Sequence, residues 1–251
     1  MTDIKDRVFF HGTEATFARK LLGSNDAVIF PLEQAREFTV KILEFLYDYV
    51  SEERRQQEQL LWYTEIFRDS GYVNFADSLI KFTGSEKDNL FAFGSMYITL
   101  SNFHALRYAC GNKGSECLYM IEQCMGALEF KKDMRAKGLL SEYPDLRDLF
   151  DTRNNAKPVM LEMTGVNLSQ LSNEYGGEVG LKYFKTIDEV MIAKGILHNH
   201  HPTFRLRSFD SSLVTAVYPL SEEVCRGVMQ DWTLVSDFEA LRVGPKEWLS
   251  Q

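Results

Sequence analysis

The fold of this chain is decided by residues 93–109, FGSMYITLSNFHALRYA. Residues 96–99 are rich in the β-branched and aromatic side chains that favour a strand. Ser101 or Asn102 is a suitable N-cap for a helix that follows at once. That helix has three residues at three- and four-residue spacing on one face, Ala105, Tyr108 and Ala109. The stretch therefore predicts a short strand followed directly by a helix.

The first residues of this unit are suited to binding a planar ring. Gly94 has no Cβ, so the backbone there can pass close to a planar group. Tyr97 follows three residues later, in a position to stack on a ring. An ordinary core tyrosine is the alternative interpretation.

A second strand-to-helix unit stands near the N-terminus, at residues 8–23. Its apolar residues end in His11, Gly12 and Thr13, and Gly23 can close the helix that follows. A turn histidine that caps this helix is the ordinary explanation for His11.

The two units together resemble the ADP-ribosyltransferases of the diphtheria-toxin and poly(ADP-ribose) polymerase type. That family is marked by a His, a Tyr and usually a Glu on three separate strands, and His11 and Tyr97 match the first two. The resemblance covers roughly residues 8–23, 93–110 and, more loosely, 158–206. It implies an α+β fold with a split, mainly antiparallel sheet, and NAD as co-substrate without a metal.

The resemblance also implies roles for individual residues. His11 would hydrogen-bond a hydroxyl of the adenosine ribose, with Thr13 assisting. Tyr97 would stack on the nicotinamide ring, and the Gly12 backbone would hydrogen-bond its amide. Gly94 completes the set of expected cofactor-binding residues.

The family's acidic residue stands at the start of a strand late in the core. Residues 188–192, Asp-Glu-Val-Met-Ile, match this pattern best, so Glu189 is the predicted third catalytic residue. Its carboxylate would face the positive charge that develops on the ribose as nicotinamide leaves. Glu174 and Glu178, which flank a Gly-rich loop, are the alternatives, and an exposed surface glutamate is the ordinary explanation.

The order of elements predicts one domain over residues 1–251, with helical insertions at about 32–82 and 111–157. Residues 38–49 carry an amphipathic helical face. Further strands are expected at residues 159–163, 189–192, 204–207 and 212–218. Cys110, Cys117 and Cys124 are seven residues apart, which stacks them on one helical face and does not match zinc spacing. The histidine tract at residues 198–201 also lacks matching ligands, so a solvated loop is expected.

Composition limits the partners and the location. The net charge of −8, from 28 basic and 36 acidic residues, argues against a dedicated non-specific DNA binder. Residues 182–207 nevertheless hold five basic side chains against two acidic ones, a solvated sheet face or a site for phosphates. No signal peptide and no apolar run of about 18 residues is present, which predicts a cytoplasmic protein without a membrane span.

The function implied by the resemblance is mono-ADP-ribosyl transfer from NAD to a macromolecular acceptor, either nucleic acid or protein. Small stand-alone members of the family are often toxins or effectors of toxin–antitoxin and anti-phage systems, so an antitoxin is a possible partner. Two alternatives stay open: an NAD glycohydrolase, and a catalytically inactive fold that acts as a binding module.

Overall fold

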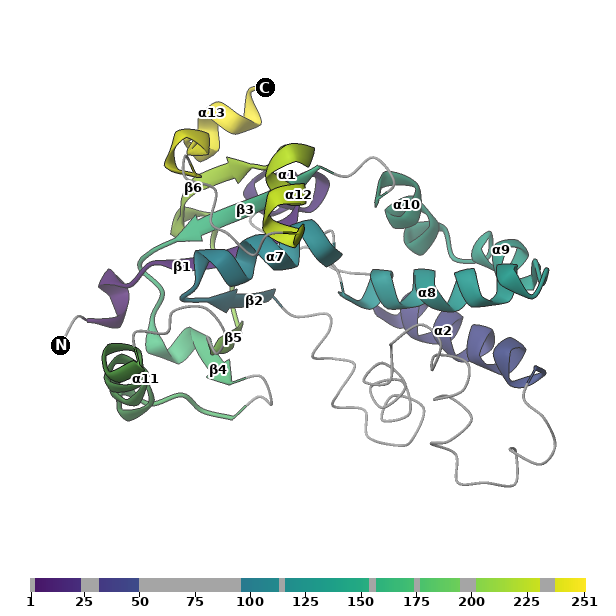
Figure 1. The fold of residues 1–251 in the computed structure, drawn as a ribbon, viewed down its shortest axis with the longest axis horizontal. Coiled ribbons are helices and arrows are strands. Elements are labelled where there is room, and N and C mark those ends of the chain that lie inside the picture. Colours follow the sequence, from purple (N-terminus) through teal and green to yellow (C-terminus); the bar gives the residue numbers. More distant parts are fainter. Residues whose placement is uncertain are drawn as a thin grey trace. The chain divides into compact units, whose positions relative to one another are not determined.

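The computed structural model describes residues 3–23, 32–49, 96–112, 116–153, 157–173, 177–194, 202–230 and 238–251. The chain divides into two compact units (Figure 1). The sheet unit comprises Met1–Ile29, Ser95–Ser115 and Asn155–Gln251. The helical unit comprises Phe30–Gly94 and Glu116–Asn154. Within the described ranges, no helix combines the length and the apolar character needed to cross a membrane.

Among the described residues, the sheet unit is built on six strands in the order β4-β5-β2-β1-β3-β6, and every neighbouring pair is antiparallel. The strands are β1 (Phe9–Glu14), β2 (Met96–Thr99), β3 (Pro158–Met163), β4 (Leu171–Asn173), β5 (Thr203–Leu206) and β6 (Val214–Pro219). The α+β class and the antiparallel sheet predicted from the sequence are confirmed.

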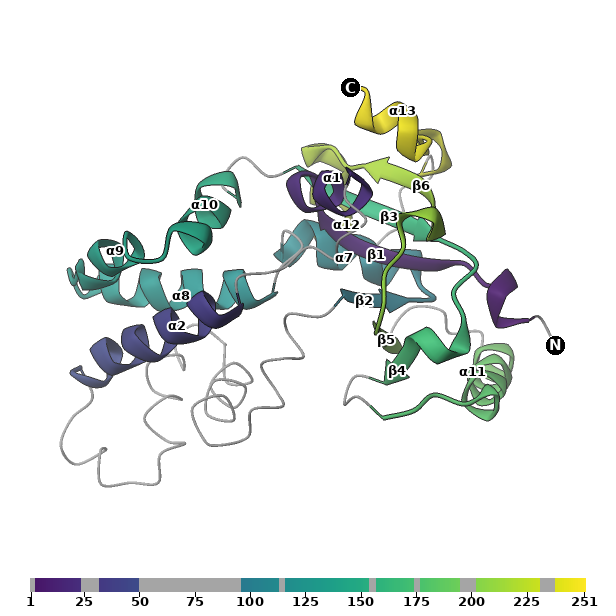
Figure 2. The same ribbon diagram turned by 180° about the vertical axis from the view of Figure 1, so that it is seen from behind.

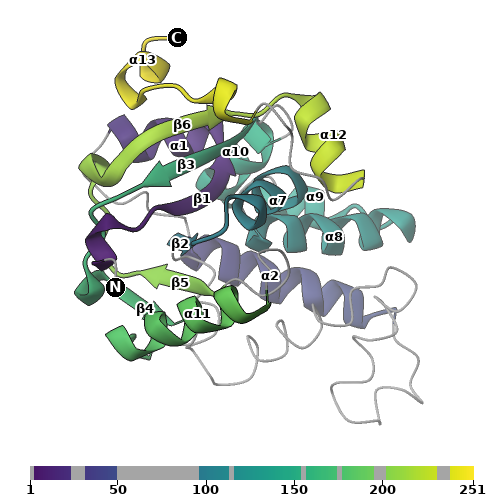
Figure 3. The ribbon, with the colours of Figure 1, turned by 60° about the vertical axis from the view of Figure 1, so that its left-hand side comes forward.

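Helices and short C-terminal elements cover the two faces of this sheet. One core joins the strands to α1 (Ala15–Gly23), α11 (Leu181–Lys194) and α13 (Pro245–Leu249). It gathers large apolar side chains, among them Phe9, Ile98, Phe184, Phe204, Leu206 and Trp248. Figure 2 shows α1 in front of the sheet, and Figure 3 shows α11 beside β5 and β4.

The opposite face, which we call the α7 face, carries α7 (Asn102–Asn112) and α12 (Glu222–Gln230). These two helices lie in front of the sheet in Figure 1. They enclose a second core whose members come from β1, β3, β6 and the helices: Phe10, Met160, Ala216, Tyr218, Leu106, Ala109 and Val228. The two cores alternate along β1, because Phe9 joins the first and Phe10 packs against the second.

Both strand-to-helix units predicted from the sequence are confirmed. β2 spans the predicted residues, and the Ser101 hydroxyl oxygen accepts the backbone N–H of His104 at 3.1 Å, so Ser101 caps α7. β1 runs directly into α1, which ends at Gly23 as expected. β3 and β5 also fall where strands were predicted.

The strand predicted at residues 189–192 is wrong, because these residues belong to helix α11. The apolar run that suggested a strand is the last part of a helical pattern. Phe184 and Ile187, three residues apart, contact the first core from this helix. The expectation that Cys110, Cys117 and Cys124 share one helical face is also wrong, since Cys110 lies on α7 and the other two on a separate helix, α8 (Glu116–Phe130).

The helical unit contains α2 (Leu32–Tyr47), α8, α9 (Arg135–Leu140) and α10 (Pro144–Arg153). α2 packs against the other three. Its predicted apolar face is confirmed: Phe38, Ile42 and Leu46 are buried. Residues 50–95, which include the rest of the first predicted insertion, lie outside the described ranges.

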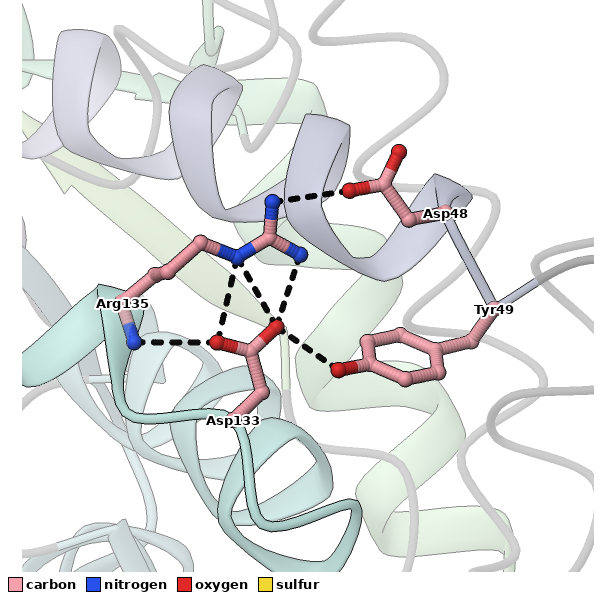
Figure 4. A network of polar contacts seen from close by, with 4 residues as sticks. All are labelled: Asp48, Tyr49, Asp133 and Arg135. Atoms are coloured by element: carbon pink, nitrogen blue, oxygen red, sulfur yellow. Dashed lines mark hydrogen bonds and ion pairs between the residues drawn. The ribbon is translucent and has the colours of Figure 1, made fainter.

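A polar network holds the end of α2 to the turn between α8 and α9 (Figure 4). The buried Asp133 carboxylate accepts hydrogen bonds from Arg135 Nε at 3.0 Å, Arg135 Nη2 at 2.7 Å and the Tyr49 hydroxyl at 2.9 Å. Arg135 Nη1 also donates to Asp48 at 2.8 Å. The Arg135 guanidinium holds the pKa of Asp133 well below its usual range.

Asp133→Asn is expected to destabilise the helical unit by about 1–3 kcal/mol, because it removes the buried charged acceptor of the Arg135 and Tyr49 hydrogen bonds. A carboxyl group whose pKa falls on folding stabilises the native state above its unfolded pKa and loses this contribution as the pH falls. Urea unfolding at pH 7 and pH 3 measures both effects. Asp48→Asn, which removes an exposed partner of the same arginine, is the control. Equal effects of the two substitutions at pH 7 would contradict the role given to Asp133.

Candidate functional site

The site predicted from His11 and Tyr97 lies where two strands stop pairing. All six residues of β1 pair with β3, from Phe9↔Met163 to Glu14↔Pro158. Towards β2, the pairing in the described strands is limited to Phe10↔Thr99. Beyond that position the His11 ring bridges the strands, with its Nδ1 2.7 Å from the Tyr97 carbonyl oxygen. The structure therefore brings these two predicted residues together.

The bond to Tyr97 defines how His11 can act. A carbonyl oxygen only accepts, so Nδ1 must carry the hydrogen and donate it. In the neutral ring this leaves Nε2 as an acceptor. Burial lowers the pKa of His11 to about 4, although the bond to the Tyr97 carbonyl opposes this change. The ring is therefore neutral at pH 7, and it suits a hydroxyl donor better than a phosphate.

Gly12 is required by the packing of α7 on β1. A Cβ at this position would lie 2.0 Å from the Ala105 carbonyl oxygen and 2.8 Å from the Ala109 nitrogen. Both are backbone atoms of α7, so neither can move without the helix. The space beside the Gly12 Cα is thus filled by a helix in this structure.

The last residues of β1 are buried. Thr13, predicted to assist His11, is 2% exposed and pairs with Val159 of β3. Glu14 is 3% exposed, and its carboxylate accepts the backbone N–H groups of Thr16 and Phe17, both at 2.8 Å. Glu14 therefore caps the N-terminus of α1, where a carboxylate is favourable. Sequence reasoning missed this cap, although an acidic residue directly before the helix was the available signal.

Tyr97 belongs to a row of four side chains, each on a neighbouring backbone segment of the sheet. It pairs with Arg205 of β5, Arg205 pairs with Ser172 of β4, and Ser172 pairs with Glu178. Paired residues in a sheet point to the same side. Their neighbours Ile98, Phe204, Leu206, Leu171 and Val179 all belong to the first core. The row therefore lies on the α7 face.

Glu189 does not join this row. It lies on α11 with its side chain 65% exposed, 3.9 Å from Lys185 one helical turn away. The adjacent Asp188 makes a long-range ion pair, in which both of its oxygens accept hydrogen bonds from Arg7, at 2.8 and 2.5 Å. The structure thus corrects the prediction that Glu189 begins a strand, and it does not bring Glu189 to His11 or Tyr97.

The remaining candidates divide into described and undescribed residues. Glu178 is exposed and lies at the end of the row that contains Tyr97. Gly94, Glu174 and the histidine tract at residues 198–201 lie outside the described ranges. Among the residues that are described, no cluster of three or more His, Cys, Asp or Glu side chains is suited to a metal ion.

Glu162 is a carboxylate on the α7 face that is already engaged. It accepts hydrogen bonds from the Tyr218 hydroxyl at 2.6 Å, the Thr215 hydroxyl at 2.9 Å and Arg242 at 2.9 Å. Burial tends to raise the pKa of Glu162, but these hydrogen bonds outweigh it and lower the pKa. The residue ties β3 to β6 and to the C-terminal segment, which is a structural role.

Comparison of this chain with protein-family models, with curated proteins and with solved structures gives no match.

Proposed function

We propose that this chain is an ADP-ribosyltransferase that cleaves NAD at the nicotinamide–ribose bond and transfers ADP-ribose to a macromolecular acceptor. The observation that carries the proposal is the His11–Tyr97 bridge across the unpaired part of β1 and β2. It places a neutral acceptor nitrogen against the backbone of the aromatic residue, at a strand edge that has no ladder partner among the described residues. The resemblance of the two strand-to-helix units to this family supports the same conclusion.

Each of these features matches a part of the dinucleotide. His11 Nε2 accepts a hydrogen bond from a ribose hydroxyl, because Nδ1 is already committed to Tyr97. The Tyr97 ring offers a stacking surface for nicotinamide. Past Phe10, the edge of β1 that faces β2 has no ladder partner among the described strands, so its backbone amides suit the carboxamide. The residues present therefore fit NAD without a metal.

A binding module that holds NAD without cleaving it is the second candidate. It is favoured by the residue that stands across from Tyr97 on β5, which is Arg205 and not an acidic residue. A cation at that position repels the positive charge that develops on the ribose during cleavage, and so it disfavours the transition state. Of the two proposed catalytic carboxylates that the structure describes, Glu178 and Glu189, the strand pairing puts Glu178 on the face of Tyr97.

Tyr97→Ala is expected to weaken NAD binding more than Tyr97→Phe, because the ring face makes the stacking contact and the hydroxyl does not. Stacking contributes about 0.5–1.5 kcal/mol beyond burial, which corresponds to a roughly 2- to 13-fold change in Kd for Tyr97→Ala. Calorimetry with the purified chain measures this. Folded protein that does not bind NAD at millimolar concentration would overturn the proposal.

Incubation with labelled NAD and cell lysate separates the two candidates. Label that survives nuclease identifies a protein acceptor, and label that survives protease identifies a nucleic acid.

The carboxylate is tested with two matched variants. If Glu178→Gln loses turnover while Glu189→Gln retains it, the result supports transfer with Glu178 as the carboxylate. NAD that binds but stays intact supports the binding module, and free ADP-ribose without labelled acceptor indicates a glycohydrolase. Growth arrest on expression of the active chain tests the toxin or effector role.

A further inference from the structure

Arg205 is a cation placed next to the proposed stacking residue. It lies on β5 directly across from Tyr97 of β2, and both side chains are on the α7 face. Cross-strand partners have their Cβ atoms about 4.5–5.5 Å apart, so the Arg205 side chain can reach a group that extends towards β5 from a ring on Tyr97. Both residues are partly buried.

The charge of Arg205 is not matched inside the described part of the chain. There its guanidinium makes no ion pair and no hydrogen bond, and only its backbone carbonyl is used, by the Ser172 hydroxyl at 3.4 Å. The nearest carboxylate along the row, Glu178, is two strand spacings away, about 9–10 Å between backbones. A cation partly withdrawn from water is unfavourable unless an anion accompanies it.

The neighbouring groups indicate what kind of anion fits. The Ser172 hydroxyl already donates to the Arg205 carbonyl, so the charged donors of this segment are Arg205 itself and Arg207, just past the end of β5. A guanidinium binds two oxygens of a phosphate at once through its planar fork. His11, which is neutral and accepts at Nε2, does not compete for the same group.

We propose that Arg205 binds the diphosphate of the dinucleotide whose nicotinamide ring lies on Tyr97. This inference rests on the proposed function and adds a specificity-determining residue to it. The ring and the phosphate are recognised by adjacent residues of β2 and β5. The site is therefore expected to bind ligands that contain the diphosphate more tightly than it binds nicotinamide or nicotinamide riboside.

Calorimetry with two fragments tests the inference. ADP-ribose carries the diphosphate without the nicotinamide ring, and nicotinamide riboside carries the ring without phosphate. Arg205→Gln is expected to weaken ADP-ribose binding about tenfold or more and to leave nicotinamide riboside binding unchanged. Arg205→Lys, which keeps the charge and loses the fork, should fall between. Lys182→Gln, which removes an exposed positive charge from α11, is the control and should bind both fragments like the parent chain.

The outcomes separate this inference from the proposed function. If Arg205→Gln changes the affinity for both fragments equally, or for neither, the inference is wrong even when NAD is bound and cleaved. If ADP-ribose binds through Arg205 while nicotinamide riboside and NAD cleavage are absent, the phosphate site stands and the proposed function fails. If Arg205→Gln and Glu178→Gln lower the Tm alike without an effect on ADP-ribose affinity, Arg205 is an ion-pair partner of Glu178 and the inference is wrong.

Discussion

Gly12→Ala is expected to destabilise the sheet unit by about 3 kcal/mol or more, the upper end of what overpacking produces. The added Cβ would lie 2.0 Å from the Ala105 carbonyl oxygen and 2.8 Å from the Ala109 nitrogen, far inside van der Waals contact. Because these are backbone atoms, the clash is relieved only by moving α7 away from β1. That movement opens the second core, in which Leu106 and Ala109 are buried.

Urea unfolding followed by circular dichroism measures this loss, and a second glycine in the same unit provides the control. Gly227 lies within α12, and a Cβ built there meets nothing within 4 Å. Gly227→Ala is therefore expected to gain about 0.5–1 kcal/mol through its helix preference. If Gly12→Ala proves as stable as the parent chain, then α7 does not approach β1 as closely as the structure shows.

The features that the sequence predicted well are those with local physical causes. The strand at residues 96–99 and its following helix depend on side-chain preferences and on the Ser101 cap, all within a few residues. The same holds for β1 and α1, because an apolar run marks the strand and Gly23 ends the helix. His11 and Tyr97 each stand at a fixed place within such a local unit, so their positions on β1 and β2 follow from it.

The features that the sequence missed depend on pairing between distant segments. The apolar residues after Asp188 fit a strand or a helix equally well, and the contact of Asp188 with Arg7 spans 181 positions. The row from Tyr97 to Glu178 exists only through the register of three strand pairs. For this reason Arg205 was noticed for its charge but could not be placed beside Tyr97.

Cysteine spacing misled for a related reason. A seven-residue repeat aligns side chains only while one helix continues, and here α7 ends at Asn112 before α8 begins at Glu116. Cys110 instead meets Cys225 of α12, and this neighbouring thiol, together with burial, raises the pKa of Cys110. The partner lies 115 positions away, which no local spacing could indicate.

Stability is expected to rise by about 3 kcal/mol between pH 4 and pH 6.5 through His11 alone. Its pKa is about 4 in the folded chain against an ordinary value of 6.5. In this window the unfolded chain binds a proton at His11 and the folded chain does not, so acid favours unfolding. Below about pH 4 both states are protonated and the contribution stops changing. The difference of about 2.5 between the folded and unfolded pKa values of His11 sets the size of this change in stability.

The difference between the parent chain and His11→Asn isolates this contribution from the carboxyl groups that titrate nearby. The asparagine amide nitrogen occupies nearly the place of Nδ1, so it can still donate to the Tyr97 carbonyl but does not titrate. Urea unfolding from pH 4 to pH 8 should therefore show the parent chain losing more stability in acid than His11→Asn does.

Nuclear magnetic resonance of the imidazole provides the direct check. The signal that disappears in His11→Asn identifies the ring, and its nitrogen shifts should show hydrogen on Nδ1 and a lone pair on Nε2 at pH 7. The midpoint of the ring's pH titration should lie near pH 4. A midpoint near 6.5 would mean that the ring is solvated and not held between β1 and β2. Hydrogen on Nε2 would exclude the bond to Tyr97, and with it the acceptor that the proposed ribose contact requires.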